Sequence, residues 1–372
     1  MSSPLRHLFR FQESGLLLVI LALGVLLTVF SGSVRIPSFE LAADGSRQRV
    51  FTVNAAGERV PAFVEKNKFL NAQNFAQLAK DTSFIAIMAV GMSIVIISGG
   101  IDLSVGSIYA LASVVGALTF QHFGPEGVAA GTDPGLAVAL GALACVGTAA
   151  LCGLANGGLI VSLRVHPFII TLGAMAILRG IAFVATKGQS IGGFPPLFRE
   201  LVRKETTGGL SLVPLGVMLV ILVLGWIFLS RLAAGRRVYA VGGNELASRF
   251  SGIRVERVKL GVYLLSGLAA GVSALIALGY YGSASSGDGQ GYELNVIAAA
   301  VVGGASLTGG RGTALGAVLG ALIIQMISSG IVILGIDQNF SQIIIGTVVI
   351  AAVVLDNFNT WLAKRRLTAK AA

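Results

Sequence analysis

Ten apolar runs, most of them about as long as a membrane-crossing helix, divide this sequence. An α-helix of about 20 residues crosses the roughly 30 Å of hydrocarbon in a bilayer. Because lipid offers the backbone no hydrogen-bond partner, a crossing segment of this kind must be helical. The sequence therefore predicts an all-α polytopic membrane protein. The predicted spans are residues 14–33, 83–100, 103–123, 135–161, 166–187, 211–231, 258–281, 293–308, 313–335 and 340–361.

The charged residues indicate how these spans are oriented. Only 12% of the residues are charged, about half the fraction expected of a soluble domain. The net charge of +10 could indicate a nucleic-acid partner, but many basic residues gather after the sixth span and at the C-terminal tail. Cytoplasmic segments of membrane proteins are enriched in Lys and Arg. We therefore predict that both termini are cytoplasmic and that the basic excess reflects orientation in the lipid bilayer, with no nucleic-acid partner.

Several classes of chemistry lack the residues that they need. Cys145 and Cys152 lie in one apolar run, which excludes a disulfide framework. No CxxC or HExxH pattern occurs, so no metal site is predicted. The sequence has no Gly-Lys dipeptide and hence no P-loop, whose Lys contacts the phosphates. We expect a non-catalytic chain that binds no cofactor and takes its energy from a separate subunit or from an ion gradient.

Two segments on the predicted outer side interrupt the apolar pattern. Residues 34–82 are polar and mixed in charge, and residues 48–64 contain two short β-runs around a Gly-containing turn. This pattern predicts a small extracytoplasmic hairpin. Residues 192–209 have Pro and Gly at their edges and an amphipathic middle, which is typical of an interfacial helix. The alternative is that both segments are solvated loops without a partner.

The predicted cytoplasmic loop at 235–258 contains one short helix. Asn244 can cap its first turn, and Gly252 can adopt the left-handed conformation that ends a helix. Leu246, Phe250 and Ile253 fall at positions i, i+4 and i+7 and form one apolar face. These side chains either fold back on the membrane surface or dock into a cytoplasmic protein, since helix-in-groove recognition uses this spacing.

Four segments resemble the permease subunits of bacterial ABC importers for monosaccharides, of which ribose permeases are the best-known kind. They are AVGMSIVIISGGIDLSVGS (89–107), NGGLIVSLRVHPFIITLGAMAILRGIAF (156–183), GRRVYAVGGNELASRFSGIRVERVK (235–259) and GYELNVIAAAVVGGASLTGGRGT (291–313). The resemblance covers most of the chain from about residue 67 onward and leaves residues 34–66 unexplained. Permeases for branched-chain amino acids share the overall plan and remain an alternative.

The resemblance implies one transmembrane permease domain over residues 1–372, in the cytoplasmic (inner) membrane of a bacterium. Its implied partners are a second permease copy or a related permease, cytoplasmic ATP-binding subunits that hold ATP and Mg, and an extracytoplasmic sugar-binding protein. It also implies that residues 244–254 form a coupling helix that docks on the ATP-hydrolysing subunit. The residues assigned to coupling are Glu245, Leu246, Ala247, Phe250, Gly252 and Ile253.

The segment Ser98 to Ser107 places an acid among glycines and serines between two apolar runs. A charged group inside a membrane is costly and is usually retained for a function. Asp102 can cap the helix that follows, act as a pivot between two helices, or line a sugar pathway. A weak repeat places residues 98–100 over residues 308–310, and Gly106 over Gly316, which is consistent with two related halves.

Further polar residues lie within the predicted spans and are candidates for the substrate pathway. Arg179 and Glu293 each need a partner, and a structural ion pair that fastens helices together is preferred over contact with sugar. Asn156 and Thr171 are uncharged hydrogen-bonding groups that suit a neutral polyol. An ion-coupled transporter, with Asp102 and Glu293 as carriers, is the alternative from another class. The candidate pathway residues are Asp102, Ser104, Asn156, Thr171, Arg179 and Glu293.

Overall fold

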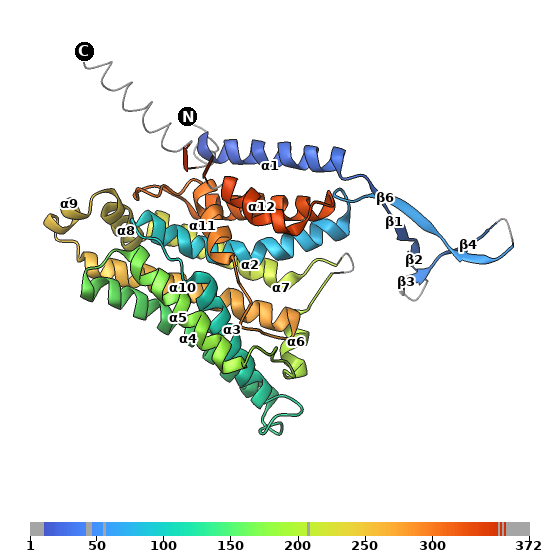
Figure 1. The fold of residues 1–372 in the computed structure, drawn as a ribbon, viewed down its shortest axis with the longest axis horizontal. Coiled ribbons are helices and arrows are strands. Elements are labelled where there is room, and N and C mark those ends of the chain that lie inside the picture. The colour runs from blue at the N-terminus through green and yellow to red at the C-terminus, as the bar shows by residue number, and fades with distance from the viewer. Residues whose placement is uncertain are drawn as a thin grey trace, which may run out of the picture.

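Glycines and polar residues interrupt the apolar runs and set the helix boundaries in the computed structural model. The structure describes residues 11–41, 47–54, 57–206, 209–348, 350–351 and 353–354. The helices within these residues are α1 (Phe11–Phe30), α2 (Ala72–Ile97), α3 (Val105–His122), α4 (Pro134–Leu163), α5 (Pro167–Thr186), α6 (Pro196–Val202), α7 (Leu212–Arg231), α8 (Ala233–Gly243), α9 (Glu245–Phe250), α10 (Val255–Tyr281), α11 (Tyr292–Val302) and α12 (Ala314–Ile333). Figure 1 shows the longer helices packed side by side in a bundle.

Seven described helices are long and apolar enough to cross a membrane, which confirms a polytopic helical protein. They are α2, α3, α4, α5, α7, α10 and α12. The predicted span at 293–308 is wrong, because α11 has only 11 residues and covers about 16 Å at 1.5 Å per residue. The chain turns after Val302, where Gly304 adopts a φ of 95°. Of the predicted span at 340–361, residues 341–348 are helical and residues 355–361 lie outside the described part.

The centre of the bundle is α2, whose side chains are buried along almost the whole helix. α10 packs closely on α4 and α2, and α12 packs on α2 and α11. By contrast, α5 and α7 leave many Leu, Ile, Val and Phe side chains exposed. A membrane protein presents such apolar surfaces to lipid.

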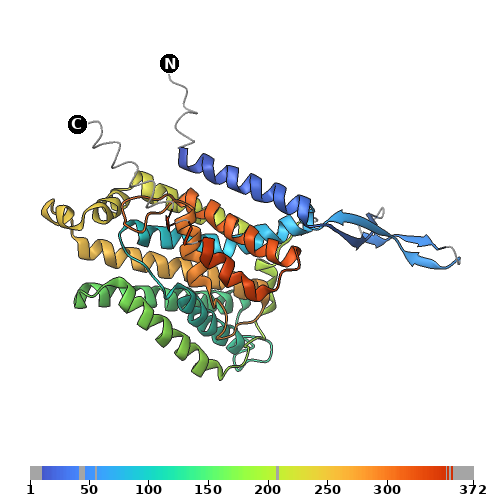
Figure 2. The same cartoon turned by 45° about the horizontal axis from the view of Figure 1, so that its top comes forward.

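A β-ribbon projects from one end of the bundle in both cartoon views (Figures 1 and 2). Its antiparallel pairs are β1 (Ser33–Pro37) with β6 (Phe63–Asn67), β2 (Phe39–Leu41) with β3 (Arg47–Arg49), and β4 (Phe51–Val53) with β5 (Arg59–Pro61). The predicted hairpin at 48–64 is confirmed by β4 and β5, and the ribbon extends beyond it. The predicted outer segment at 34–82 extends too far toward its C-terminal end, because α2 begins at Ala72 with Asn71 as its cap.

The predicted interfacial helix at 192–209 corresponds to α6, which lies at the ribbon end of the bundle in Figure 1. The predicted short helix in the segment 235–258 corresponds to α9, and α8 precedes it. α8 and α9 lie at the end of the bundle opposite the ribbon. The two predicted outer segments therefore lie at one end of the membrane-crossing helices, and the predicted cytoplasmic loop lies at the other end.

Candidate functional site

The first element of the site is the break between α2 and α3 at residues 98–104. Gly99 adopts a left-handed φ of 83°, and the chain then runs irregularly until α3 begins at Val105. Irregular backbone at membrane depth must find protein partners. Here the hydroxyl of Tyr263 on α10 donates to the carbonyl oxygen of Ile101 at 3.1 Å, and Gly310 N donates to Ile97 O at 2.9 Å.

Asp102 is the centre of a buried hydrogen-bond network. Its side chain has no exposed surface. Oδ1 accepts from the backbone N of Ser104 at 3.0 Å and from its hydroxyl at 2.6 Å, and Oδ2 accepts from the Ser266 hydroxyl at 3.0 Å. Asn156 on α4 donates to the Ser104 hydroxyl oxygen at 2.7 Å. Both carboxylate oxygens are thus occupied by protein donors, and the network joins α4 and α10 to the break.

Thr171 on α5 completes the group around the break. Its hydroxyl is 3.0 Å from the carbonyl oxygen of Pro167 and 3.5 Å from that of Ile101. The structure therefore brings together four of the six predicted pathway residues: Asp102, Ser104, Asn156 and Thr171. They come from α4, α5 and the break itself, and all are buried.

Arg179 and Glu293 lie apart from this group, and among the described residues they do not form the close ion pair that the sequence analysis preferred. Arg179 Nη1 donates to the backbone oxygens of Ser286 at 2.9 Å and Asp288 at 2.6 Å. Among the described residues, neither Arg179 nor Glu293 forms a salt bridge. Glu293 Oε2 is buried with no hydrogen-bond partner in the described part of the chain, and a Cβ at Gly106 would collide with it. The backbone oxygens of Ser286 and Asp288 are thus the hydrogen-bond partners of Arg179, and the charges of Glu293 and Asp288 act on it from a longer distance.

A second break, residues 303–313 between α11 and α12, lies against the first. Gly309 adopts a φ of 83°, as Gly99 does in the first break. The predicted correspondence of residues 98–100 with 308–310 therefore has a matching backbone feature. The Tyr239 hydroxyl on α8 donates to Gly312 O at 2.7 Å. A Cβ at Gly242, also on α8, would collide with Ile97 O, so this helix contacts both breaks.

The structure confirms both predicted ends of α9. The Asn244 side chain accepts from Ala247 N at 2.9 Å, and Gly252 adopts a φ of 80°. Leu246 is 64% exposed and Phe250 is 84% exposed. Ile253 is half-buried beside α8 and α10, so the predicted apolar face of three side chains is reduced to two. The loop after Phe250 turns Ile253 away, because Gly252 breaks the helical spacing.

Ion pairs that the sequence analysis missed fasten α9 to the start of α10. Lys259 Nζ lies 2.8 Å from Glu245 Oε2, and Arg249 lies 2.8 Å from Glu256. Arg249 also approaches Glu245 at 3.4 Å. In one continuous helix, residues 14 apart would be separated by about 21 Å along the axis, so the turn between α9 and α10 brings Glu245 and Lys259 together.

A cavity of about 880 Å³ lies between α9 and the first break. Its lining includes Gly99, Gly100, Asn244, Lys259 and Tyr263. Polar groups of the α9–α10 junction therefore face the same space as the break. This geometry places the exposed helix α9, the cavity and the break between α2 and α3 next to one another.

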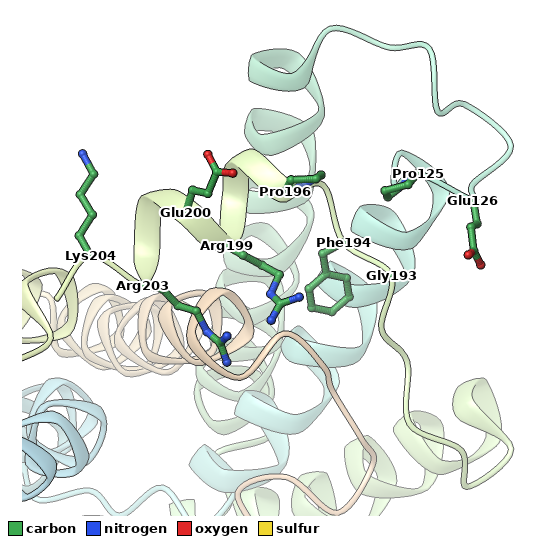
Figure 3. A pocket seen from close by; sticks show the side chains of 9 residues that line it. All are labelled: Pro125, Glu126, Gly193, Phe194, Pro196, Arg199, Glu200, Arg203 and Lys204. Carbon is green, nitrogen blue, oxygen red and sulfur yellow. The ribbon is translucent and has the colours of Figure 1, made fainter. Parts of the chain in front are cut away.

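A second cavity, of about 760 Å³, lies beside α6 at the ribbon end. Figure 3 shows Arg199 and Arg203 pointing to one side of α6, while Glu200 and Lys204 point to the other. Arg203 Nε donates to Tyr280 O at 2.5 Å. Phe194 packs in an aromatic cluster with Phe120 and Phe198, which anchors this segment to the bundle.

Comparison with known proteins decides the family. The family model for the permease component of the branched-chain amino acid transport system matches residues 74–353. This chain belongs to the ABC transporter permeases. The permease is 37% identical over 293 residues to the ribose import permease protein RbsC of Escherichia coli, covering 78% of this chain and 87% of the relative. No solved structure matches the chain.

Two other relatives of this permease show similar coverage. The RbsC protein of Bacillus subtilis is 38% identical over 289 residues, covering 77% of this chain and 86% of the relative. The D-allose transport system permease protein AlsC of Escherichia coli is 35% identical over 288 residues, covering 77% and 84%. The family match starts at residue 74, after the β-ribbon, so the ribbon is an addition to the matched permease region. The permease is therefore a non-catalytic transmembrane subunit.

Proposed function

We propose that this permease translocates a monosaccharide, a ribose-like pentose or a hexose, in an ATP-driven importer. The observation that carries the proposal is its identity of 35–38% to ribose and D-allose permeases over more than three quarters of the chain. The uncharged side chains Asn156 and Thr171 beside the break suit a substrate that bears hydroxyl groups and no charge. Membership in an ABC family favours ATP over an ion gradient as the energy source.

The exposed pair Leu246 and Phe250 on α9 is the proposed contact with a cytoplasmic ATP-binding subunit. Two large apolar side chains on a capped helix fit a groove on a partner protein. ATP and Mg bind to that partner, because the permease has no P-loop. Closure of the ATP-binding subunits then displaces α9 and α8. Since Tyr239 and Gly242 of α8 contact the two breaks, this displacement reaches the hinge beside Asp102.

Asp102 acts in this proposal as a structural pivot of the hinge. Its oxygens accept three hydrogen bonds from protein groups, and none of its surface is exposed. A sugar that passes the break meets the surrounding hydroxyl and amide groups, which bind it weakly. Weak binding is appropriate in a permease that receives its substrate from a separate receptor.

The cavity beside α6 is the proposed contact for an extracytoplasmic sugar-binding protein. It presents both basic and acidic side chains, among them Arg199, Glu200 and Lys204. In the orientation that this proposal requires, the α6 cavity and the β-ribbon are outside, and α9 and both termini are cytoplasmic. Two permease chains and two ATP-binding subunits form the complete importer in the inner membrane of a bacterium.

The docking proposal is tested by copurification of the coexpressed ATP-binding subunit with the tagged permease. Leu246→Asp with Phe250→Asp should abolish copurification while the permease retains its size-exclusion profile. Leu201→Asp is the control, because it introduces an aspartate at an exposed leucine on α6 at the opposite end of the bundle. Full copurification of the double variant would contradict the proposal.

Branched-chain amino acids are the second candidate substrate, because the matching family model carries that description. The ligand of the cognate binding protein separates the two candidates. Competition of labelled ribose uptake by unlabelled sugars, but not by leucine, isoleucine or valine, would support the sugar. The reverse pattern would support the amino acids.

A further inference from the structure

A groove of about 780 Å³ lies where the end of α7 meets α8 and the start of α10. Its lining includes Phe228, Val258 and Leu265, which belong to two helices that are apolar enough to cross a membrane. Arg237 on α8, Arg254 before α10 and Arg257 in its first turn also line it, and all three are exposed. The groove thus has apolar walls within the predicted membrane and arginines at its boundary.

Among the described residues, no carboxylate lines this groove or forms a salt bridge with its arginines. The adjacent cavity beneath α9 is different, because Arg249 and Lys259 there pair with Glu256 and Glu245. A general excess of basic residues on one side of a membrane explains their number. It does not explain why the acids are confined to one of two neighbouring cavities.

The shape and charge of the groove fit an amphiphile with an anionic head. A guanidinium group binds phosphate oxygens with paired, charge-assisted hydrogen bonds. Basic pockets between membrane helices are known to take acidic lipid headgroups. A second copy of this chain, docked groove to groove across a two-fold axis, would instead bring six arginines together without an acid. We infer that the groove binds one acidic phospholipid, with its phosphate at Arg237, Arg254 and Arg257 and an acyl chain along Phe228 and Leu265.

The test is native mass spectrometry of the full-length permease, delipidated and then supplied with equal amounts of phosphatidylglycerol and phosphatidylcholine. The permease should retain phosphatidylglycerol preferentially. Near an acidic membrane surface one basic residue changes binding by about fivefold, so loss of three should weaken retention on the order of 100-fold. The test variant is Arg237→Gln with Arg254→Gln and Arg257→Gln.

The matched control is Arg236→Gln, which removes an exposed arginine of α8 that does not line the groove. It should retain phosphatidylglycerol as the wild type does. Because the arginines are exposed, the triple variant should keep its size-exclusion profile and melting temperature in zwitterionic detergent. Replacing the three arginines by lysine should keep most of the binding, which separates charge from loss of fold.

Three results would overturn the inference. The first is equal retention of phosphatidylglycerol by the triple variant and the wild type. The second is equal retention of the two lipids by the wild type, since that indicates apolar contact alone. The third is complete loss of phosphatidylglycerol when the ATP-binding subunit is copurified, which would assign the groove to a protein interface. Glycerol 3-phosphate should not compete, because it lacks the acyl chain that the apolar walls bind.

Discussion

Ser266 on α10 donates a hydrogen bond of 3.0 Å to Oδ2 of Asp102, across 164 residues of sequence. The same carboxylate holds Ser104 through Oδ1. The break between α2 and α3 is therefore fastened to α10, the helix that also receives the ion pairs of α9. Asp102 therefore joins the break to α10 through hydrogen bonds. Because hydrogen bonds make this connection, the negative charge of Asp102 is not required for it.

Asp102→Asn should keep substantial transport. Asparagine retains one acceptor oxygen for Ser104, and the Ser266 hydroxyl can rotate to accept from the new amide group. Asp102→Ala should be worse, because it leaves the Ser104 and Ser266 donors buried without an acceptor, at about 1–3 kcal/mol for each unsatisfied group. Uptake and the melting temperature of the purified protein measure the two effects. Full loss of transport in a normally assembled Asp102→Asn variant would restore a charged-site role.

Gly153→Val should destabilise the bundle by about 1–3 kcal/mol or prevent assembly. Gly153 on α4 faces Gly267 on α10 in a small-residue packing pattern, and a Cβ at Gly153 would collide with Tyr263 O. Gly158→Val on the same helix is the control, because a Cβ there meets nothing within 4 Å. Thermal unfolding in detergent should separate the two variants, and equal melting temperatures would refute the packing argument.

Gly242→Ala should impair transport much more than Gly243→Ala. A Cβ at Gly242 collides with Ile97 O and lies 2.7 Å from Gly310 N, whereas one at Gly243 meets nothing within 4 Å. The first substitution therefore separates α8 from both breaks without changing the α9 surface. We expect the ATP-binding subunit to copurify with both variants while uptake falls at least tenfold only in Gly242→Ala. Equal uptake would show that α8 need not touch the breaks.

The repeated apolar runs predicted most of the membrane helices, because the bilayer requires an apolar segment of defined length. They failed at α11, where residues 293–308 are apolar enough to cross but the chain turns at Gly303 and Gly304. Glycines and small residues occur both in tightly packed membrane helices and in breaks between them. Apolar composition alone cannot tell these two environments apart.

The sequence predicted the local features of the candidate site but not its long-range contacts. Asn244 and Gly252 end α9 as predicted, because capping and left-handed turns depend on local sequence. The distant partners of Asp102 and Arg179 were not predicted. Ser266 and the carbonyl oxygens of Ser286 and Asp288 lie more than 100 residues away, and no periodicity identifies such contacts.

Asn244→Ala should weaken docking of the ATP-binding subunit without removing Leu246 or Phe250. Loss of an N-cap costs about 1 kcal/mol, and α9 has only six residues over which to recover it. Asn244→Asp should dock normally, because aspartate keeps the oxygen that accepts from Ala247 N. Binding of the purified subunit to the immobilised permease measures the difference. Identical affinities for the Ala variant and the wild type would show that the cap does not order the docking helix.

The most direct measurement is uptake of a labelled monosaccharide into proteoliposomes that contain this permease and its ATP-binding subunit. The cognate binding protein is supplied outside and ATP with Mg inside. We predict uptake that requires all three proteins and ATP and that is unchanged by an uncoupler. Uptake that persists without the ATP-binding subunit, or that collapses with the uncoupler while ATP is maintained, would contradict an ATP-driven sugar permease.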